Sequence, residues 1–105
     1  MGDRRLAEIR TEDGSMYFYT HWSGYELPRI AEESLRYAEQ RKNDSPYALK
    51  MVLDYLIKEC GGRDGALNCG IGLDPGHTGE DEYRGDPTSV LIDLDRWIAL
   101  PKEID

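Results

Sequence analysis

Apolar and polar residues alternate along two stretches near the start of the chain, with the period of two that is typical of a β-strand. The first stretch is Leu6–Thr11 and the second is Met16–Trp22, and the turn sequence Glu-Asp-Gly-Ser separates them. The two stretches therefore predict a β-hairpin. In the second strand, alternation puts Met16, Phe18, Thr20 and Trp22 on one face and Tyr17, Tyr19 and His21 on the other.

After Gly24 the apolar period changes to that of a helix. The pattern predicts a first helix from Leu27 to about Arg41, with Pro28 in its first turn. A second helix begins at Pro46, runs to about Cys60, and ends at the Gly-Gly pair that follows. The body of the second helix is apolar or tyrosine except at three positions spaced four residues apart, which predicts a largely buried central helix with one narrow exposed stripe. The stripe consists of Lys50, Asp54 and Lys58.

Two further strands are predicted in the second half of the chain, at Ala66–Asp74 and Ser89–Asp95. Residues 75–87 between them are rich in Pro, Gly and charge, and predict a loop. In the later strand Val90, Ile92 and Leu94 are expected to face inward, and Leu91, Asp93 and Asp95 outward. The segment 96–100 either extends that strand or forms a closing turn before Pro101.

The predicted order is β-β-α-α-β-β in a single domain covering residues 1–105. We expect an α+β fold, in which a four-stranded antiparallel sheet carries both helices on one face. Gly70 and Gly72 share one face of the third strand, and strand glycines accept a large ring from a neighbouring strand. We therefore expect Tyr17 or Tyr19 to lie over one of these glycines, on the face away from the helices.

Charge is distributed unevenly along this chain of net charge −8. Residues 1–58 carry 10 acidic and 9 basic residues, whereas residues 59–105 carry 11 acidic and 4 basic ones. Direct nucleic-acid binding is disfavoured, because phosphate recognition needs clustered Lys and Arg, and a protein partner with a basic surface is favoured instead. Neither an apolar run of about 18 residues nor an apolar N-terminal signal segment is present, so we expect a cytoplasmic protein without membrane contact.

The acidic residues of the second half form the first candidate site, a surface that binds without catalysis. A calcium loop is disfavoured there, because Gly85 stands where an EF-hand loop starting at Asp74 needs its bidentate Glu. The candidate binding residues are Asp74, Glu80, Asp81, Glu82, Asp86, Asp93 and Asp95.

The aromatic segment at the end of the second strand forms the alternative site, for a small nucleotide-like ligand. Unpaired N–H groups at the start of the following helix favour an anion, and a histidine such as His21 can donate or transfer a proton near neutral pH. A purely structural role is the competing interpretation, since Trp22 shares the face of Met16 and Phe18 and belongs to the core on that reading. The residues of this alternative site are Tyr17, Tyr19, His21, Trp22, Ser23, Gly24 and Tyr25.

No spacing in the sequence implies a metal, a cofactor or a catalytic set. His21, His77 and Cys69 match no zinc pattern, and the glycines around Ile71 depart from the dinucleotide fingerprint. Cys60 and Cys69 lie nine residues apart, and in a reducing compartment half-buried inert thiols are favoured over a disulfide.

Four segments of the chain resemble a family of small uncharacterised proteins found in phages, prophages and bacteria. They are YFYTHWSG, ELP, PYALKMVLDYLI and CGIG, and together they span most of residues 16–73. Ser23 stands where the family motif Tyr-Thr-His-Trp-Gly-Gly has its first Gly, and KNDSPY keeps only part of the family's Trp-Asp-Asp-x-x-Tyr helix start. The resemblance implies a mobile-element or host-defence setting and no particular activity.

Together with the charge, this resemblance favours a non-catalytic acidic binding protein, such as a phage-type anti-defence inhibitor that acts by protein–protein contact. The alternative is a small-ligand binder or a small enzyme that uses the face of Tyr17, Tyr19 and His21. The sequence leaves a homo-oligomer open.

Overall fold

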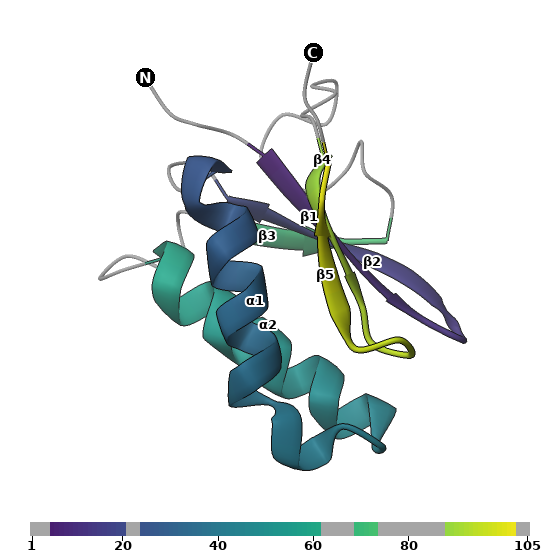
Figure 1. The fold of residues 1–105 in the computed structure, drawn as a ribbon. Coiled ribbons are helices and arrows are strands. Elements are labelled where there is room, and N and C mark those ends of the chain that lie inside the picture. Colours follow the sequence, from purple (N-terminus) through teal and green to yellow (C-terminus); the bar gives the residue numbers. More distant parts are fainter. Residues whose placement is uncertain (1–4, 21–23, 62–68, 74–87, 103–105) are drawn as a thin grey trace.

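A computed structural model describes residues 5–20, 24–61, 69–73 and 88–102 (Figure 1). The fold is α+β, as predicted, with both helices on one face of a sheet. The strands are β1 (Arg5–Thr11), β2 (Gly14–Thr20), β3 (Cys69–Gly72), β4 (Thr88–Asp93) and β5 (Ile98–Pro101). The helices are α1 (Leu27–Tyr37) and α2 (Ser45–Gly61), with short 3-10 turns η1 (Gly24–Glu26) and η2 (Glu39–Arg41).

The sheet differs from the predicted four-stranded antiparallel arrangement. Among the described residues it has five strands in the order β3-β2-β1-β4-β5, and β1 and β4 run parallel while the other neighbours are antiparallel. The fifth strand arises because the chain turns back after Asp93, so residues 98–101 pair with β4 instead of extending it. Val90, Leu91 and Ile92 are all buried, which is the continuous apolar run expected of a strand covered on both faces.

The β1–β2 hairpin forms as predicted, with Thr11 paired to Gly14 across the turn. The Asp13 N–H donates to the Thr11 Oγ1 at 3.1 Å, which closes the turn from the side chain. Gly14 has a φ of +133°, a backbone conformation that residues with a Cβ rarely adopt. The Glu-Asp-Gly signal in the sequence therefore corresponds to a turn that needs this glycine.

Helix α1 is shorter than predicted. It ends at Tyr37, and Ala38 leaves the helical backbone while its N–H still bonds the Ser34 carbonyl oxygen at 3.0 Å. The Arg41 N–H then bonds the Ala38 carbonyl oxygen at 2.9 Å, three residues back, so residues 39–41 form a tighter 3-10 turn. The helix was predicted to be longer because the apolar period of the sequence continues to Ala38, which packs in the core after the helix has ended.

Helix α2 has the predicted exposed stripe, although it is less buried than expected. Lys50, Asp54 and Lys58 are exposed, and the Lys50 Nζ lies 3.0 Å from the Asp54 Oδ2. The fully buried side chains lie in the single row Ala48, Val52, Leu56 and Cys60, whereas Leu49, Met51, Leu53, Tyr55 and Ile57 are half-buried. The helix therefore packs against the sheet and α1 on one side and is not surrounded. No helix of the described residues is long and apolar enough to cross a membrane.

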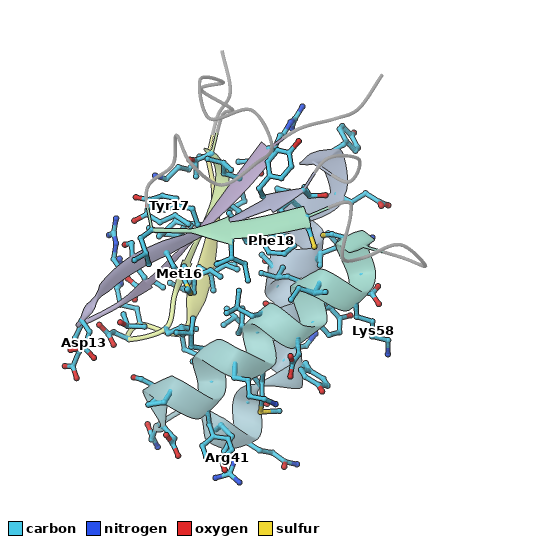
Figure 2. The ribbon with its side chains drawn as sticks, turned by 180° about the vertical axis from the view of Figure 1, so that it is seen from behind. Asp13, Met16, Tyr17, Phe18, Arg41 and Lys58 are labelled. Atoms are coloured by element: carbon cyan, nitrogen blue, oxygen red, sulfur yellow. The ribbon has the colours of Figure 1, made fainter. Side chains whose placement is uncertain are left out.

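The two faces of β2 point as the alternation predicted. Met16 and Phe18 point towards the helices, and Tyr17 points away from them (Figure 2). Phe18 is fully buried between the sheet and the helices. The face that carries Tyr17 is the far face of the sheet, away from both helices.

The predicted pairing of tyrosines with strand glycines is confirmed at the level of register. Strand β3 is the neighbour of β2, and Tyr17 pairs with Gly72 while Tyr19 pairs with Gly70. Tyr19 is only 5% exposed although it lies on the far face, which no described helix covers. Position 70 is thus beside a buried ring.

A valine at position 70 should therefore crowd the Tyr19 ring. We expect Gly70→Val to lower the free energy of unfolding by about 1–3 kcal/mol, as overpacking typically does. Urea unfolding measures this difference, and Ile71→Val is the matched control in the same strand. Equal stability of Gly70→Val and the wild type would show that the ring does not occupy the space next to Gly70.

Candidate functional site

The structure tests two of the seven acidic residues that were predicted to bind a partner. Asp95 is exposed in the turn between β4 and β5, as the prediction requires. The other five, Asp74, Glu80, Asp81, Glu82 and Asp86, lie outside the described residues.

Asp93 corrects the prediction, because its side chain is buried and not part of an exposed acidic surface. It is 6% exposed, and its Oδ1 accepts the N–H groups of Asp95 at 3.0 Å and Arg96 at 3.1 Å. The prediction treated this strand as the last one of the sheet. In the structure β4 lies between β1 and β5, so Asp93 is at the end of an inner strand. Asp93 therefore stabilises the turn that starts β5.

The alternative ligand site is described in part. Tyr17 is half-buried, Tyr19 and Gly24 are buried, and Tyr25 is 80% exposed. His21, Trp22 and Ser23 lie outside the described residues. Because Tyr19 is 5% exposed, its ring is not accessible for stacking on a ligand in this conformation, which leaves Tyr25 as the exposed aromatic of the described part of this site.

The far face also carries a polar cluster that the sequence analysis missed, here called the Glu8 cluster (Glu8, Arg10, Ser15 and Lys102). The Glu8 Oε2 accepts a hydrogen bond from the Ser15 hydroxyl at 2.8 Å and another from the Arg10 guanidinium at 3.0 Å. The Lys102 Nζ lies 3.7 Å from the Glu8 Oε1. Alternation along β1 places Glu8 on the same face as buried Leu6. A charged residue on the face of a buried apolar one is the feature of the sequence that could have predicted this cluster.

The electrostatics of the cluster keep Glu8 ionised. Burial on its own raises the pKa of this carboxyl group, but the hydrogen bonds from Ser15 and Arg10 and the positive charges of Arg10 and Lys102 outweigh burial. The pKa of Glu8 therefore lies below its ordinary value. An ionised carboxylate with its donors already in place is suited to holding β1, β2 and the end of β5 together, and not to transferring a proton at neutral pH.

A matched substitution tests this structural role. Glu8→Gln should lower the free energy of unfolding at pH 7 by about 1–3 kcal/mol, because it removes a buried charge that receives two hydrogen bonds. Since the folded-state pKa is lowered, the contribution of Glu8 is present above the pKa of the unfolded chain and is lost as the pH falls through the folded-state value. The stability difference between wild type and Glu8→Gln should therefore shrink on acidification.

Urea unfolding between pH 7 and pH 3 measures this difference. Glu12→Gln is the control, because Glu12 is an exposed residue of the β1–β2 turn. A difference between wild type and Glu8→Gln that stays constant over this pH range would contradict the assignment.

The two cysteines are free thiols in a protected setting. Cys60 is buried at the end of α2, and Cys69 is half-buried at the start of β3. Burial raises the pKa of Cys60 to about 12, and burial also raises the pKa of Cys69. Thiols that stay protonated at neutral pH are weak nucleophiles, in agreement with the interpretation as inert half-buried residues.

The described residues contain no group of three or more His, Cys, Asp or Glu side chains positioned to hold a metal ion. Their buried side-chain N and O atoms all have a hydrogen-bond partner. A scan against protein-family models, a search of the curated proteins and a search of the solved structures each found no match to this chain. The resemblance to phage-associated proteins therefore stays a prediction from the sequence motifs.

Proposed function

We propose that this chain is a non-catalytic binding protein whose acidic second half contacts a partner protein with a basic surface. The observation that supports this most directly is the asymmetry of charge, with 11 acidic and 4 basic residues in positions 59–105. One of those four bases, Lys102, lies 3.7 Å from the Glu8 carboxylate, so its charge is partly compensated inside the fold. Asp93 is engaged inside the fold as well, so with both residues set aside positions 59–105 still contain ten acidic and three basic residues.

A field of this kind acts mainly on the rate of encounter and on the choice of partner. Like charges on nucleic acid or on another acidic protein are repelled, whereas a basic surface is attracted from a distance. Salt weakens this attraction, because the Debye length falls from about 10 Å at 0.1 M to about 3 Å at 1 M. Binding of the partner should therefore be strongly sensitive to salt.

The chemistry of the described residues agrees with a binding role. Glu8 is an ionised carboxylate engaged by Ser15, Arg10 and Lys102, and Cys60 is a buried thiol with a raised pKa. Neither side chain is poised as a base or a nucleophile. The resemblance to phage-associated proteins favours a host-defence protein as the partner and inhibition by contact as the consequence.

The proposal is tested with a partner isolated from host lysate at stepped salt and then purified. Dissociation constants are measured for the wild type and for the triple variant Glu80→Gln, Asp81→Asn, Glu82→Gln. Binding should weaken roughly 10-fold, since three exposed ion pairs of about 0.5 kcal/mol each amount to a factor of ten. The melting temperature should stay nearly unchanged.

A matched control removes three exposed charges of the first half of the chain, through Glu12→Gln, Asp13→Asn and Asp54→Asn. This control should bind nearly as the wild type does. The rival hypothesis places a ligand site at His21, and then His21→Ala abolishes activity while the triple variant behaves as wild type. That result would overturn the acidic-surface proposal in favour of the ligand site.

A further inference from the structure

Helix α1 and strand β5 lie next to each other (Figure 1). Residues of α1, η2 and the start of β5 line a groove between them. Its volume is about 260 Å³. Its apolar lining consists of buried Leu35 and Ala99, half-buried Trp97 and exposed Ile98. The groove thus offers an apolar surface with one large aromatic ring.

The turn holds Trp97 in place. The Asp93 carboxylate accepts the N–H groups of Asp95 and Arg96, and Trp97 follows with a φ of +57°. Part of the Trp97 side chain packs against the core. A ring that is already fixed loses little conformational entropy when a ligand stacks on it.

The rim of the groove is formed by charged residues of α1 and η2. Glu32, Arg36 and Glu39 follow one another at helical spacing and are exposed beside the groove. Within the described part of the chain, none of the three has an ion-pair partner within 4.0 Å. Arg36 can compensate only one of the two carboxylates, which leaves the rim with a net negative charge.

An adjacent stripe of α1 is different, because its charges already engage one another. Arg29 lies 3.2 Å from the Glu26 carboxylate and 2.9 Å from that of Glu33, and the Tyr55 hydroxyl donates to Glu33 at 3.1 Å. The charges of this stripe are satisfied by one another, and the Tyr55 hydroxyl adds a contact from α2. The groove side of α1 therefore has carboxylates that are available to a ligand.

We propose that this α1–β5 groove receives an arginine side chain from the basic partner, an inference that rests on the proposed function. A guanidinium group is flat, stacks on an indole ring, and donates paired N–H groups to a carboxylate. Trp97 supplies the ring, and Glu32 or Glu39 supplies the carboxylate. A volume of about 260 Å³ is below the range of about 300–1,000 Å³ typical of small-molecule pockets, which suits one inserted side chain.

The direct test uses the peptide acetyl-Gly-Arg-Gly-amide as the probe and the full chain labelled with ¹⁵N. The expected result is a saturable shift of the Trp97 indole N–H and of the Leu35 and Ala99 amides. The neutral isostere acetyl-Gly-citrulline-Gly-amide should bind at least 3-fold more weakly, because it lacks the charge. Absence of a saturable shift, shifts confined to other residues, or equal binding of both peptides would overturn the inference.

Variants locate the binding. Glu32→Gln combined with Glu39→Gln should weaken the arginine peptide about 3- to 10-fold, whereas the matched control Glu12→Gln with Glu59→Gln should stay within about 2-fold. Trp97→Leu keeps an apolar side chain, removes the ring, and should weaken the peptide by a similar factor. Equal binding by the groove variant and its control would overturn the inference.

Failure of the inference can be told apart from failure of the proposed function. The variant at Glu80, Asp81 and Glu82 should bind the arginine peptide as the wild type does, since the inference assigns the peptide to Trp97 and to Glu32 or Glu39. If this variant loses the protein partner while the variant at Glu32 and Glu39 retains it, the groove inference is wrong and the proposed function stands. A second outcome is that the groove binds the peptide, while the affinity for the partner changes neither with salt nor in the variant at Glu80, Asp81 and Glu82. The proposed function is then wrong and the groove assignment stands.

Discussion

Replacement of Phe18 by Ala is expected to lower the free energy of unfolding by about 3–5 kcal/mol, the usual cost of deleting a buried aromatic ring. Phe18 is fully buried and lies in β2 between Ala7 of β1 and Ile71 of β3. Its neighbour Ala7 is small, so no large side chain beside it on β1 can fill the cavity. The ring also connects the sheet to the core that both helices share.

The measurement is urea unfolding followed by far-UV circular dichroism. Phe18→Leu should cost less than Phe18→Ala, because most of the volume is kept. Tyr25→Ala is the aromatic control, and since Tyr25 is 80% exposed the change should stay within about 0.5 kcal/mol. A cost below about 1 kcal/mol for Phe18→Ala would mean that β2 does not pack on the helices as described.

Local features of the fold were predictable because each has a local cause. The β1–β2 hairpin follows from alternation and a Glu-Asp-Gly turn, and the face of Phe18 follows from the same alternation. The exposed line of Lys50, Asp54 and Lys58 follows from the helical period. These features depend on neighbours within a few residues, which a sequence pattern represents directly.

The arrangement of the strands was not predictable in the same way, because it depends on pairs far apart in the chain. The parallel pairing of β1 with β4 joins residues about 80 positions apart, such as Ala7 and Val90. The continuous apolar run Val90–Ile92 is typical of a strand covered on both faces. The sequence prediction instead assumed that inward and outward residues alternate along this strand. Asp93 was assigned to the surface for this reason, although it stabilises the β4–β5 turn.

The same distinction between local and long-range features applies to the candidate sites. Acidic residues were identified from composition, and the charge asymmetry stays the main support for the proposed function. The Glu8 cluster and the α1–β5 groove escaped notice because each joins segments that are distant in sequence, such as Ser15 with Lys102 and Glu32 with Trp97. A pattern along the chain cannot show which charges are compensated inside the fold and which stay available, and that distinction decides what a surface can bind.

The stability of the protein should fall above pH 9 because of Cys60. Burial raises the pKa of this thiol from its ordinary value near 9 to about 12, so the unfolded chain loses the proton well before the folded protein does. The stabilisation is complete below the pKa of the unfolded thiol and is lost as the pH rises towards the folded-state value. A single proton gives a slope of at most about 1.4 kcal/mol per pH unit, so the loss between pH 9 and pH 10.5 is at most about 2 kcal/mol.

Urea unfolding under reducing conditions at pH 7, 9 and 10.5 tests this, with Cys60→Ala as the variant that lacks the titrating group. Below pH 8 the variant should be less stable than the wild type by about 1 kcal/mol, since it loses part of a buried side chain. By pH 10.5 it should be the more stable of the two, because Tyr and Lys titrations affect both proteins equally and cancel in the comparison. Cys69→Ala keeps Cys60 and should retain most of the wild-type loss of stability, and the remainder belongs to Cys69, whose pKa is also raised by burial. Parallel loss of stability in the wild type and Cys60→Ala would show that the folded protein does not hold the Cys60 proton.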